Sequence, residues 1–324
     1  MYFLHKQGID PVLLNPAHSK RARELRDNSP NKTDRKDPKV LVDLLMMGFG
    51  SRVVLPEGKL ADLRVLVGLR EELLDDIKRT KNRLEAHLAG YFPEYWKLMR
   101  GLGTVSSRQI LAQWPSPDAL AEAGPEAIGQ LLRRVSRGKL GAERARALWQ
   151  AARDTVGIPE GREAAELATQ TRMAQVMELL SREKQLCSRI QALLAQLPRA
   201  ALLQSMPGIG IITSAILLGE LGDLSRYRTQ DEVLKMAGLN LYECSSGRHQ
   251  GRRHITKRGR PLVRKALYMA TLNMVKTGGV FHQVYRDHRK KGMAKVKALV
   301  AVGRKLLATL YAMVRDGTVW APAG

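Results

Sequence analysis

Two adjacent serines near the middle of the C-terminal third are placed for covalent chemistry. Ser245 and Ser246 are followed by Gly247, Arg248 and His249 in a polar stretch. A serine hydroxyl attacks a phosphate only when its proton is removed or the developing charge is stabilised. Guanidinium groups supply such stabilisation in phosphoryl transfer. The pattern is consistent with a serine nucleophile at either residue, and also with a Ser/Gly loop that only turns the chain.

Two aspartates in the N-terminal region are spaced for metal binding. Asp34 and Asp37 lie three residues apart in Lys-Thr-Asp-Arg-Lys-Asp. At the start of a helix, such carboxylates project from one face and can share a divalent metal. A two-metal phosphodiester site normally needs three or four carboxylates. Capping of the helix by Thr33 and Asp34 explains the same residue types, so the spacing leaves both interpretations open.

The C-terminal third is strongly basic. Between Arg248 and Lys305 there are 17 Lys/Arg and one acid, Asp287, in a chain of formal net charge +23. This charge is typical of a polyanion-binding surface, with a merely solvated basic face as the alternative. The predicted nucleic-acid contacts are Arg248, Arg252, Arg253, Lys257, Arg258, Arg260, Arg264 and Lys265.

Glycine-rich turns occur twice between apolar segments. Gly208 and Gly210 lie in Met-Pro-Gly-Ile-Gly, and residues 99–111 repeat the pattern about a hundred positions earlier. The pattern is typical of a helix-hairpin-helix, in which glycine amides at a helix N-terminus contact DNA phosphate without reading sequence. We expect Gly208 and Gly210 to contact phosphate. A tight turn between two helices is the alternative for both segments.

The elements that position these residues are predicted to be mainly helical. Residues 1–50 indicate a short strand at Pro11–Leu14, a helix from about Ser19, a polar loop, and a helix over Lys39–Met47. Residues 94–160 indicate helices punctuated by Gly and Pro. Residues 198–324 indicate a helical domain interrupted only around Leu239–Gly259.

Heptad spacing predicts two long helices, from Leu60 to Leu88 and from Met173 to Leu197. Arg70 and Lys81 interrupt the apolar seam of the first helix, and Glu183 interrupts the second. Such helices suit coiled-coil pairing within one chain or between chains. Packing within one chain is the simpler interpretation of the first, whereas the second is also a candidate for oligomerisation.

Composition excludes several classes of protein. With 324 residues and 44% hydrophobic content, the chain folds and is long enough for two or three domains. Aromatic residues make up 5%, which argues against base stacking as the main binding mode. The contexts of Cys187 and Cys244 suggest neither a disulfide framework nor a zinc site. We expect no membrane span or signal peptide, and a reducing cytosol as the compartment.

Taken together, these residues resemble the IS110-type insertion-sequence transposases over essentially the whole chain. Upstream, Asn15-Pro16 and Lys32–Asp37 are similar to the segment that carries the last two acids of that family's DEDD set. The similar C-terminal segments are Pro207-Gly-Ile-Gly, Thr213-Ser-Ala, Leu221-Gly-Asp-Leu-Ser-Arg-Tyr, Ala237-Gly-Leu, Ser246-Gly, Ile255-Thr-Lys-Arg-Gly and Leu262-Val-Arg-Lys-Ala-Leu.

The resemblance implies a mixed, mostly α fold in four parts. Residues 1–93 are expected to form a partial DEDD nuclease-like domain of ribonuclease-H-like α/β type with a long helix. Residues 94–160 are a helical segment with a hairpin turn, and residues 161–197 a coiled coil. Residues 198–324 are an all-α transposase domain that contains a helix-hairpin-helix.

The resemblance also implies a cytoplasmic, nucleoid-associated protein of a bacterium or archaeon, and a mechanism. A DNA transposase of this type cuts and rejoins DNA through a serine, here Ser246 with Ser245 as the fallback. Asp34 and Asp37 would bind Mg²⁺. A structured guide (bridge) RNA directs the reaction, and the active site is assembled in a homo-oligomer, a dimer or tetramer.

One departure from the family pattern limits this expectation. The family's first Asp and its Glu lie on strands before the segment that begins here, and no matching residues precede Val12. We therefore expect an N-terminally truncated nuclease domain with an incomplete metal site. The alternatives are a catalytically dead DNA/RNA-binding relic of such a transposase, and a helix-hairpin-helix protein of DNA repair or junction binding.

Overall fold

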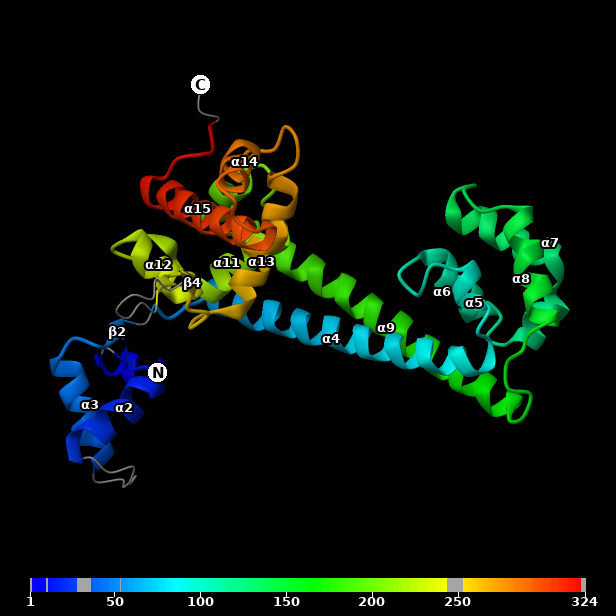
Figure 1. The fold of residues 1–324 in the computed structure, drawn as a ribbon, viewed down its shortest axis with the longest axis horizontal. Helices are drawn as coiled ribbons and strands as arrows, with labels where there is room; N and C mark the ends of the chain where they lie inside the picture. The colour runs from blue at the N-terminus through cyan, green and yellow to red at the C-terminus, as the bar shows by residue number, and fades with distance from the viewer. Residues whose placement is uncertain (1, 10, 28–35, 53, 244–252, 322–324) are drawn as a thin grey trace. The chain divides into compact units, whose positions relative to one another are not determined.

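The computed structural model describes residues 2–9, 11–27, 36–52, 54–243 and 253–321. The described part of the chain is mostly helical and holds two small antiparallel sheets (Figure 1). This confirms the predicted mostly-α class. The chain divides into one unit of residues 1–65 and 193–324 and a second unit of residues 66–192. No helix in the described ranges has the length and apolar character needed to cross a membrane.

The N-terminal part of the first unit places helices beside a short two-stranded sheet. Helices α1 (Tyr2–Lys6), α2 (Pro16–Asp27) and α3 (Lys36–Met46) accompany strands β1 (Val12–Leu13) and β2 (Ser51–Arg52). Val12 pairs with Arg52 and Leu13 with Ser51. Both predicted helices and the first strand are confirmed, whereas β2 was not predicted.

The start of α2 is explained by the residues before it. The side-chain oxygen of Asn15 accepts a hydrogen bond from the backbone N–H of Ala17 at 3.0 Å. Pro16 occupies the first helical position, where the N–H that it lacks has no intrahelical partner. Helix α2 therefore begins three residues earlier than the sequence analysis expected, at the Asn15-Pro16 pair.

The C-terminal part of the first unit is built around α15 (Lys295–Asp316). Its buried residues recur every three or four positions, including Leu299, Val302, Leu306 and Leu310, as expected for a helix packed on one side. Full burial of each such side chain contributes about 1.5–3 kcal/mol. The helices packed on α15 are α10 (Pro198–Ser205), α12 (Gln230–Ala237), α13 (Pro261–Met274) and α14 (His282–Lys290). Helix α11 (Ile211–Leu221) packs on α10 and α13.

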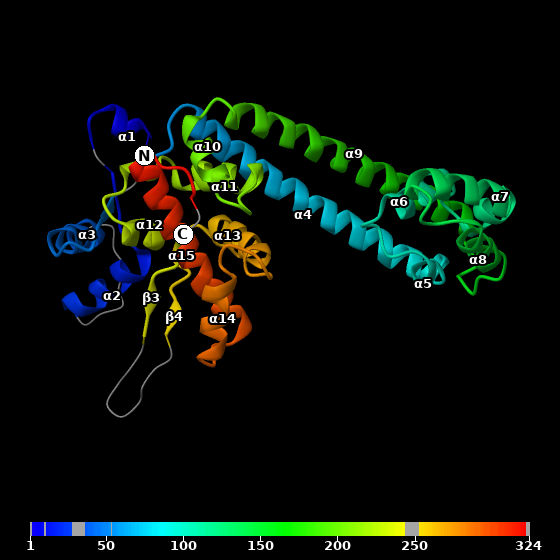
Figure 2. The same ribbon diagram turned by 90° about the horizontal axis from the view of Figure 1, so that it is seen from above.

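The second unit contains two long helices that run antiparallel. Helices α4 (Lys59–Tyr91) and α9 (Arg162–Leu194) lie side by side in both views (Figures 1 and 2). Near one end of this pair Arg70 contacts Glu183, and near the other the His87 ring lies 3.0 Å from the Ala165 carbonyl oxygen. Heptad residues of both helices are buried, among them Val67, Leu84, Met173, Val176 and Ile190. Pairing within the chain therefore accounts for both apolar seams.

Two of the residues that interrupt the seams, Arg70 of α4 and Glu183 of α9, contact each other. Arg70 Nη2 lies 2.8 Å from Glu183 Oε1. Arg70 Nε donates to Cys187 Sγ at 3.3 Å, and the Cys187 thiol donates to Glu183 Oε1 at 3.2 Å. Burial opposes the charge of Arg70, but the contacts with Cys187 and Glu183 outweigh it and raise the pKa of the guanidinium. Burial also raises the pKa of the Cys187 thiol.

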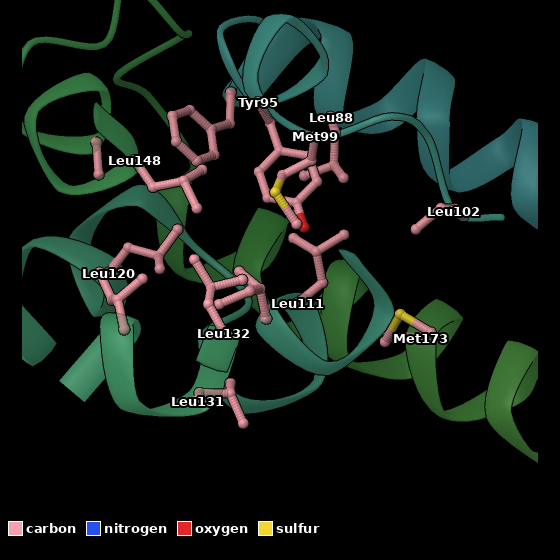
Figure 3. Close-up of a cluster of buried hydrophobic side chains, with 14 of the residues drawn as sticks. Leu88, Tyr95, Met99, Leu102, Leu111, Leu120, Leu131, Leu132, Leu148 and Met173 are labelled. Carbon is pink, nitrogen blue, oxygen red and sulfur yellow. The ribbon is translucent and has the colours of Figure 1, made fainter. Parts of the chain in front are cut away.

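Four helices connect α4 to α9 and form an apolar core together with Leu88 of α4 and Met173 of α9. They are α5 (Tyr95–Leu98), α6 (Val105–Gln113), α7 (Pro117–Ser136) and α8 (Ala142–Arg153). Figure 3 shows Tyr95, Leu132 and Leu148 in this core, all with less than 1% of their surface exposed. The Tyr95 hydroxyl donates to the Ser107 carbonyl oxygen at 2.8 Å, and burial raises the pKa of Tyr95.

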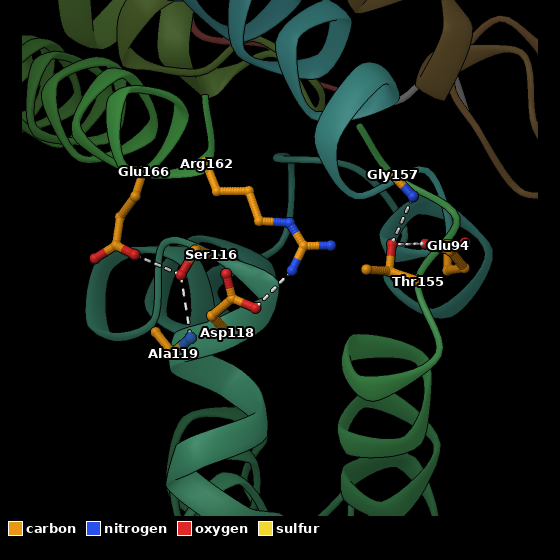
Figure 4. Close-up of polar contacts among 8 residues, drawn as sticks. All are labelled: Glu94, Ser116, Asp118, Ala119, Thr155, Gly157, Arg162 and Glu166. Carbon is orange, nitrogen blue, oxygen red and sulfur yellow. Dashed lines mark hydrogen bonds and ion pairs between the residues drawn. The ribbon is translucent and has the colours of Figure 1, made fainter. Parts of the chain in front are cut away.

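Polar contacts join this helical core to the ends of the long helices (Figure 4). Ser116 caps α7 by accepting from the Ala119 N–H at 3.1 Å, and its hydroxyl donates to Glu166 of α9 at 2.6 Å. Glu94 accepts from the Thr155 hydroxyl at 2.8 Å and from the Val156 N–H at 3.1 Å. These contacts fix the segments that enter and leave the core.

Candidate nucleic-acid interface

A β-hairpin brackets the serine-containing segment in sequence. Strands β3 (Leu241–Tyr242) and β4 (His254–Ile255) pair antiparallel, with Tyr242 opposite His254 (Figure 2). The rings of Tyr242 and His254 have centroids 6.1 Å apart. Glu243 directly follows β3 and Arg253 directly precedes β4. Arg253 Nε lies 2.8 Å from Glu243 Oε2. The predicted interruption of the helical domain at 239–259 is thus this hairpin.

Several predicted site residues lie between these strands, outside the described part of the chain. They are Ser245, Ser246, Arg248 and Arg252. The described residues therefore define what precedes and follows the predicted nucleophile. They place Glu243 and Arg253 at the two ends of the segment that contains it.

The backbone after β4 packs tightly on the end of α12. Lys257 N–H donates to the Gly238 carbonyl oxygen at 3.0 Å, and Arg260 N–H to the Met236 carbonyl oxygen at 2.9 Å. A Cβ atom at Gly259 would lie 2.3 Å from that Met236 oxygen, which is a severe steric clash. Gly238 has a φ of 69°, which favours glycine. These contacts explain why Ala-Gly-Leu and Ile-Thr-Lys-Arg-Gly occur together in this sequence.

This backbone packing presents two exposed cations. Lys257 and Arg258 are exposed, and neither has a carboxylate partner among the described residues. Lys257 has a φ of 55°, which is unusual for a residue with a side chain and indicates that the surrounding contacts determine the loop. Exposed cations on a fixed backbone suit contact with phosphate. Lys265, one helical turn into α13, is also exposed.

Arg264, Arg260 and Arg253 were also predicted to contact nucleic acid, and they have partners within the protein. Arg264 Nη1 donates to the Ala237 carbonyl oxygen at 2.9 Å, and burial lowers the pKa of its guanidinium. Arg260 Nε lies 3.6 Å from the carboxylate of Glu220. Arg253 pairs with Glu243. Arg264 therefore satisfies the carboxyl end of α12, a role that the basic run in the sequence did not indicate.

A second group of exposed cations lies on α14 and at the start of α15. Its members are Arg286, Arg289, Lys290, Lys295 and Lys297. All five fall within the basic run 248–305, but the contacts predicted from the sequence extend only to Lys265. The run itself was the signal for these residues, because it continues with one acid to Lys305.

The turn at Gly208 and Gly210 leaves the start of α11 open. Gly208 has a φ of 94°, and Gly210 is the N-cap residue of α11 without a side-chain cap. Nothing lies within 4 Å of the position that a Gly210 Cβ would occupy, and the residue is exposed. Uncapped N–H groups at a helix start suit an anion. The corresponding start of α6 differs, because the Thr104 side chain accepts from the Ser107 N–H at 3.2 Å.

The predicted metal site is represented by one of its two aspartates. Asp37 lies in the first turn of α3, and its Oδ1 is 2.8 Å from Arg23 Nη2. Asp34 lies outside the described residues. In the ranges that the structure describes, no group of three or more His, Cys, Asp or Glu is placed to hold a metal. Asp37 by itself does not complete a site for a divalent cation, because it is a single carboxylate and is paired with Arg23.

Comparison with known proteins agrees with this distribution of features. Residues 200–286 match the model described as transposase IS116/IS110/IS902 family, and residues 1–93 match a transposase model of the DEDD domain of IS110-type elements. An uncharacterized 43.6 kDa protein of insertion element IS110 from Streptomyces coelicolor is 27% identical, over 93% of this chain and 76% of its own length. A protein of insertion element IS116 from Streptomyces clavuligerus is 27% identical over 90% and 73%.

A further relative has a name of a different kind. A pilin gene-inverting protein of Moraxella bovis is 32% identical over 36% of this chain and 37% of its own length. The matches define the class of the protein, an insertion-sequence transposase. The chain belongs to the IS110/IS116/IS902 family of transposases. Membership implies DNA binding, and the DEDD model indicates use of a divalent metal.

Proposed function

We propose that the chain is a DNA transposase that cuts and rejoins DNA through a serine nucleophile, Ser246, with Ser245 as the fallback. The observation that supports this most is the β3–β4 hairpin with its adjoining loop. The hairpin brackets the two serines, and the backbone packed on α12 presents Lys257 and Arg258 directly after it. A nucleophile flanked by cations on fixed backbone suits attack on a DNA phosphate.

The chemistry would conserve the energy of the phosphodiester bond. Ser246 Oγ loses its proton and bonds to phosphorus while the bond from phosphorus to the leaving DNA oxygen breaks. The leaving oxygen takes up a proton, and the DNA end remains attached as a phosphoserine ester. Attack by a DNA hydroxyl then reverses these changes and rejoins the strand. Gly247 permits close approach of the backbone, and Arg248 and Arg252 would stabilise the charge on the pentavalent phosphorus.

The N-terminal region would supply the metal-dependent part of the reaction. We propose that residues 1–93 belong to a ribonuclease-H-like domain in which Asp34 and Asp37 are ligands of Mg²⁺. The bound metal would polarise the scissile phosphate. Because Asp37 is paired with Arg23, it must exchange this guanidinium for the metal. Additional oxygen ligands are required beyond the two aspartates.

The basic surface of the first unit would bind the nucleic acids. Arg253, Lys257, Arg258 and Lys265 would contact phosphate together with the α14 cations. Gly208 and Gly210 would do so through the N–H groups at the start of α11, in the manner of a helix-hairpin-helix. We further propose a structured guide (bridge) RNA as a second ligand, and a homo-oligomer as the active form. Since the seams of α4 and α9 are filled within one chain, oligomer contacts would use other faces.

A strand-exchange assay tests this function. The protein is incubated with guide RNA, donor DNA carrying the element ends, and Mg²⁺, and the products are resolved on denaturing gels. We expect exchanged strands and a covalent protein–DNA species that depend on the guide RNA. DNA binding without any covalent species or exchanged strand would contradict the proposal and favour a non-catalytic relic of a transposase.

A further inference from the structure

The charge of the second unit is concentrated at one corner. Residues 133–146 contain six Lys/Arg and one acid, whereas the rest of residues 66–192 contains fourteen Lys/Arg and fifteen acids. Residues 133–146 connect the end of α7 to the start of α8 and are called the α7–α8 corner below. Neither transposase model covers them, since the two matches are residues 1–93 and 200–286. The corner is therefore a basic patch outside the surface described above.

The backbone of the corner is ordered by contacts of its own. The Ser136 hydroxyl accepts from the Leu140 N–H at 2.9 Å. Arg137, the residue after α7, has a left-handed backbone conformation with a φ of 54°, and Gly138 follows with a φ of 79°. Helices α7 and α8 pack extensively on each other on either side of this turn. The basic side chains are thus presented from a defined turn between two packed helices.

The cations of the corner lie close together in sequence, with Glu143 as the single acid among them. Arg134, Arg137, Lys139 and Arg146 are exposed, and no carboxylate among the described residues pairs with them. Elsewhere in the unit, ion pairs join Arg79 to Asp76, Arg162 to Asp118 and Arg182 to Glu178. An unpaired group of four cations on a rigid turn creates a local positive potential that attracts polyanions.

Stability of the helix does not require all of these charges. A helix C-terminus favours cations, and Arg133 and Arg134 already lie in the last turn of α7. Arg137 lies beyond that turn in a conformation that glycine adopts more readily than arginine does. The Arg137 guanidinium is exposed there and can contact a ligand outside the fold.

We propose that the α7–α8 corner binds the phosphate backbone of duplex DNA through Arg134, Arg137, Lys139 and Arg146. The contact carries no sequence information, because cations meeting phosphates position a protein without reading bases. The inference rests on the proposed function, since it assumes a protein that handles DNA. The corner would be a second DNA-binding surface, in addition to the basic surface of the first unit.

The test is a triple variant of the full-length protein, Arg134→Gln, Arg137→Gly and Lys139→Gln. Glycine at 137 removes the charge and relieves the left-handed backbone, so that folding is preserved or improved. Binding of a short labelled DNA duplex of unrelated sequence is measured by fluorescence anisotropy over a range of salt concentrations. If each cation neutralises one phosphate, the salt slope of log Kd falls by about 2.7 in magnitude. The melting temperature stays unchanged or rises.

A matched control removes the same charge from α4 and α9. It carries the substitutions Lys78→Gln, Arg83→Gln and Lys184→Gln. All three residues are exposed, and each lies within three residues of an acid. This control should keep the parental salt slope. An equal fall in both variants would show that only net charge matters, and would overturn the inference.

Two further outcomes would overturn the assignment to DNA. In the first, the triple variant keeps the parental salt slope, whereas replacement of Lys257 and Arg258 lowers the salt slope. This result would leave the proposed function unaffected. The other is retained duplex binding with lost binding of a structured RNA hairpin, which would assign the corner to RNA. Failure of the unmodified protein to bind DNA at all would contradict both proposals.

Discussion

The guanidinium of Arg253 donates to the carboxylate of Glu243 at 2.8 Å, at the two residues that bracket the serine-containing segment. The side chains are 71% and 37% exposed, so this ion pair contributes only about 0.2–1 kcal/mol to stability. Its main consequence is electrostatic, because it neutralises one of the cations predicted to meet DNA.

Replacement of Glu243 by Gln should therefore tighten DNA binding. The change leaves Arg253 without its carboxylate and adds one positive charge beside the segment that contains Ser246. We expect a salt slope steeper by about one unit and a nearly unchanged melting temperature. Asp316→Asn is the control, since it frees Arg315 on α15 in the same way. Weaker binding of Glu243→Gln would mean that the pair maintains the hairpin's active shape.

The loop after β4 depends on the absence of a side chain at Gly259. Gly259→Ala would place Cβ 2.3 Å from the Met236 oxygen and 2.4 Å from the Gly238 nitrogen, both backbone atoms. We expect a loss of about 3 kcal/mol in the free energy of unfolding, and weaker DNA binding because Lys257 and Arg258 move. Urea denaturation and anisotropy measure the two effects.

The control for that change is a glycine with room around it. At Gly303, in α15, a Cβ would meet only the side chains of Thr271 and Leu267, at 3.8 and 3.9 Å. Gly303→Ala should be neutral or stabilise by up to about 1 kcal/mol, since alanine favours a helix. Equal stability of both variants would show that the loop is not packed on α12 as described.

The ion pair between α4 and α9 gives a prediction about the helical pair. The side chains of Arg70 and Glu183 are only 18% and 19% exposed. Glu183→Leu alone leaves a largely buried cation and should cost about 1–3 kcal/mol. The double variant Arg70→Leu, Glu183→Leu places apolar side chains against each other at this contact and should recover that loss. Thermal unfolding of the two variants decides, and a double variant as unstable as Glu183→Leu would contradict the described pairing.

The same pair shows how far sequence alone could reach. Heptad spacing predicted both long helices and identified Arg70 and Glu183 as interruptions. It did not predict that they meet, because periodicity determines the buried face of a helix and leaves its partner and register open. That register depends on contacts between residues more than a hundred positions apart.

The candidate site was predictable to a similar extent. Charge counting located the basic surface, and the Gly-x-Gly turn located the open start of α11. Counting could not separate exposed Lys257 from Arg264, whose guanidinium is used by the Ala237 carbonyl oxygen. That distinction depends on burial of the α12 end, which the basic run does not encode. Strand β2 was not predicted because its two residues, Ser51 and Arg52, are both polar and offer no apolar run of the kind that indicated β1.

The helical core of the second unit should be sensitive to acid through Glu94. Burial opposes ionisation of Glu94, but the Val156 N–H and the Thr155 hydroxyl outweigh it and hold its pKa below the ordinary value. A carboxyl with a lowered folded pKa contributes stability above its unfolded pKa and loses that contribution as pH falls through the folded pKa.

Glu94→Gln should therefore lower the melting temperature at about pH 7 and have a progressively smaller effect towards about pH 3. Circular dichroism melts of the parent and variant at several pH values measure the difference. A difference that stays constant over this range would show that hydrogen bonding of Glu94 does not depend on its charge.

The most direct measurement compares formation of a covalent protein–DNA species by the parent protein and by the Ser246→Ala and Ser245→Ala variants. Each is incubated with guide RNA, Mg²⁺ and donor DNA, and the adduct is detected on a denaturing gel, with duplex binding measured in parallel. We predict that Ser246→Ala abolishes the adduct and leaves DNA affinity nearly unchanged, whereas Ser245→Ala retains both. Adduct formation by Ser246→Ala at the parental level would contradict the proposed serine chemistry at this residue.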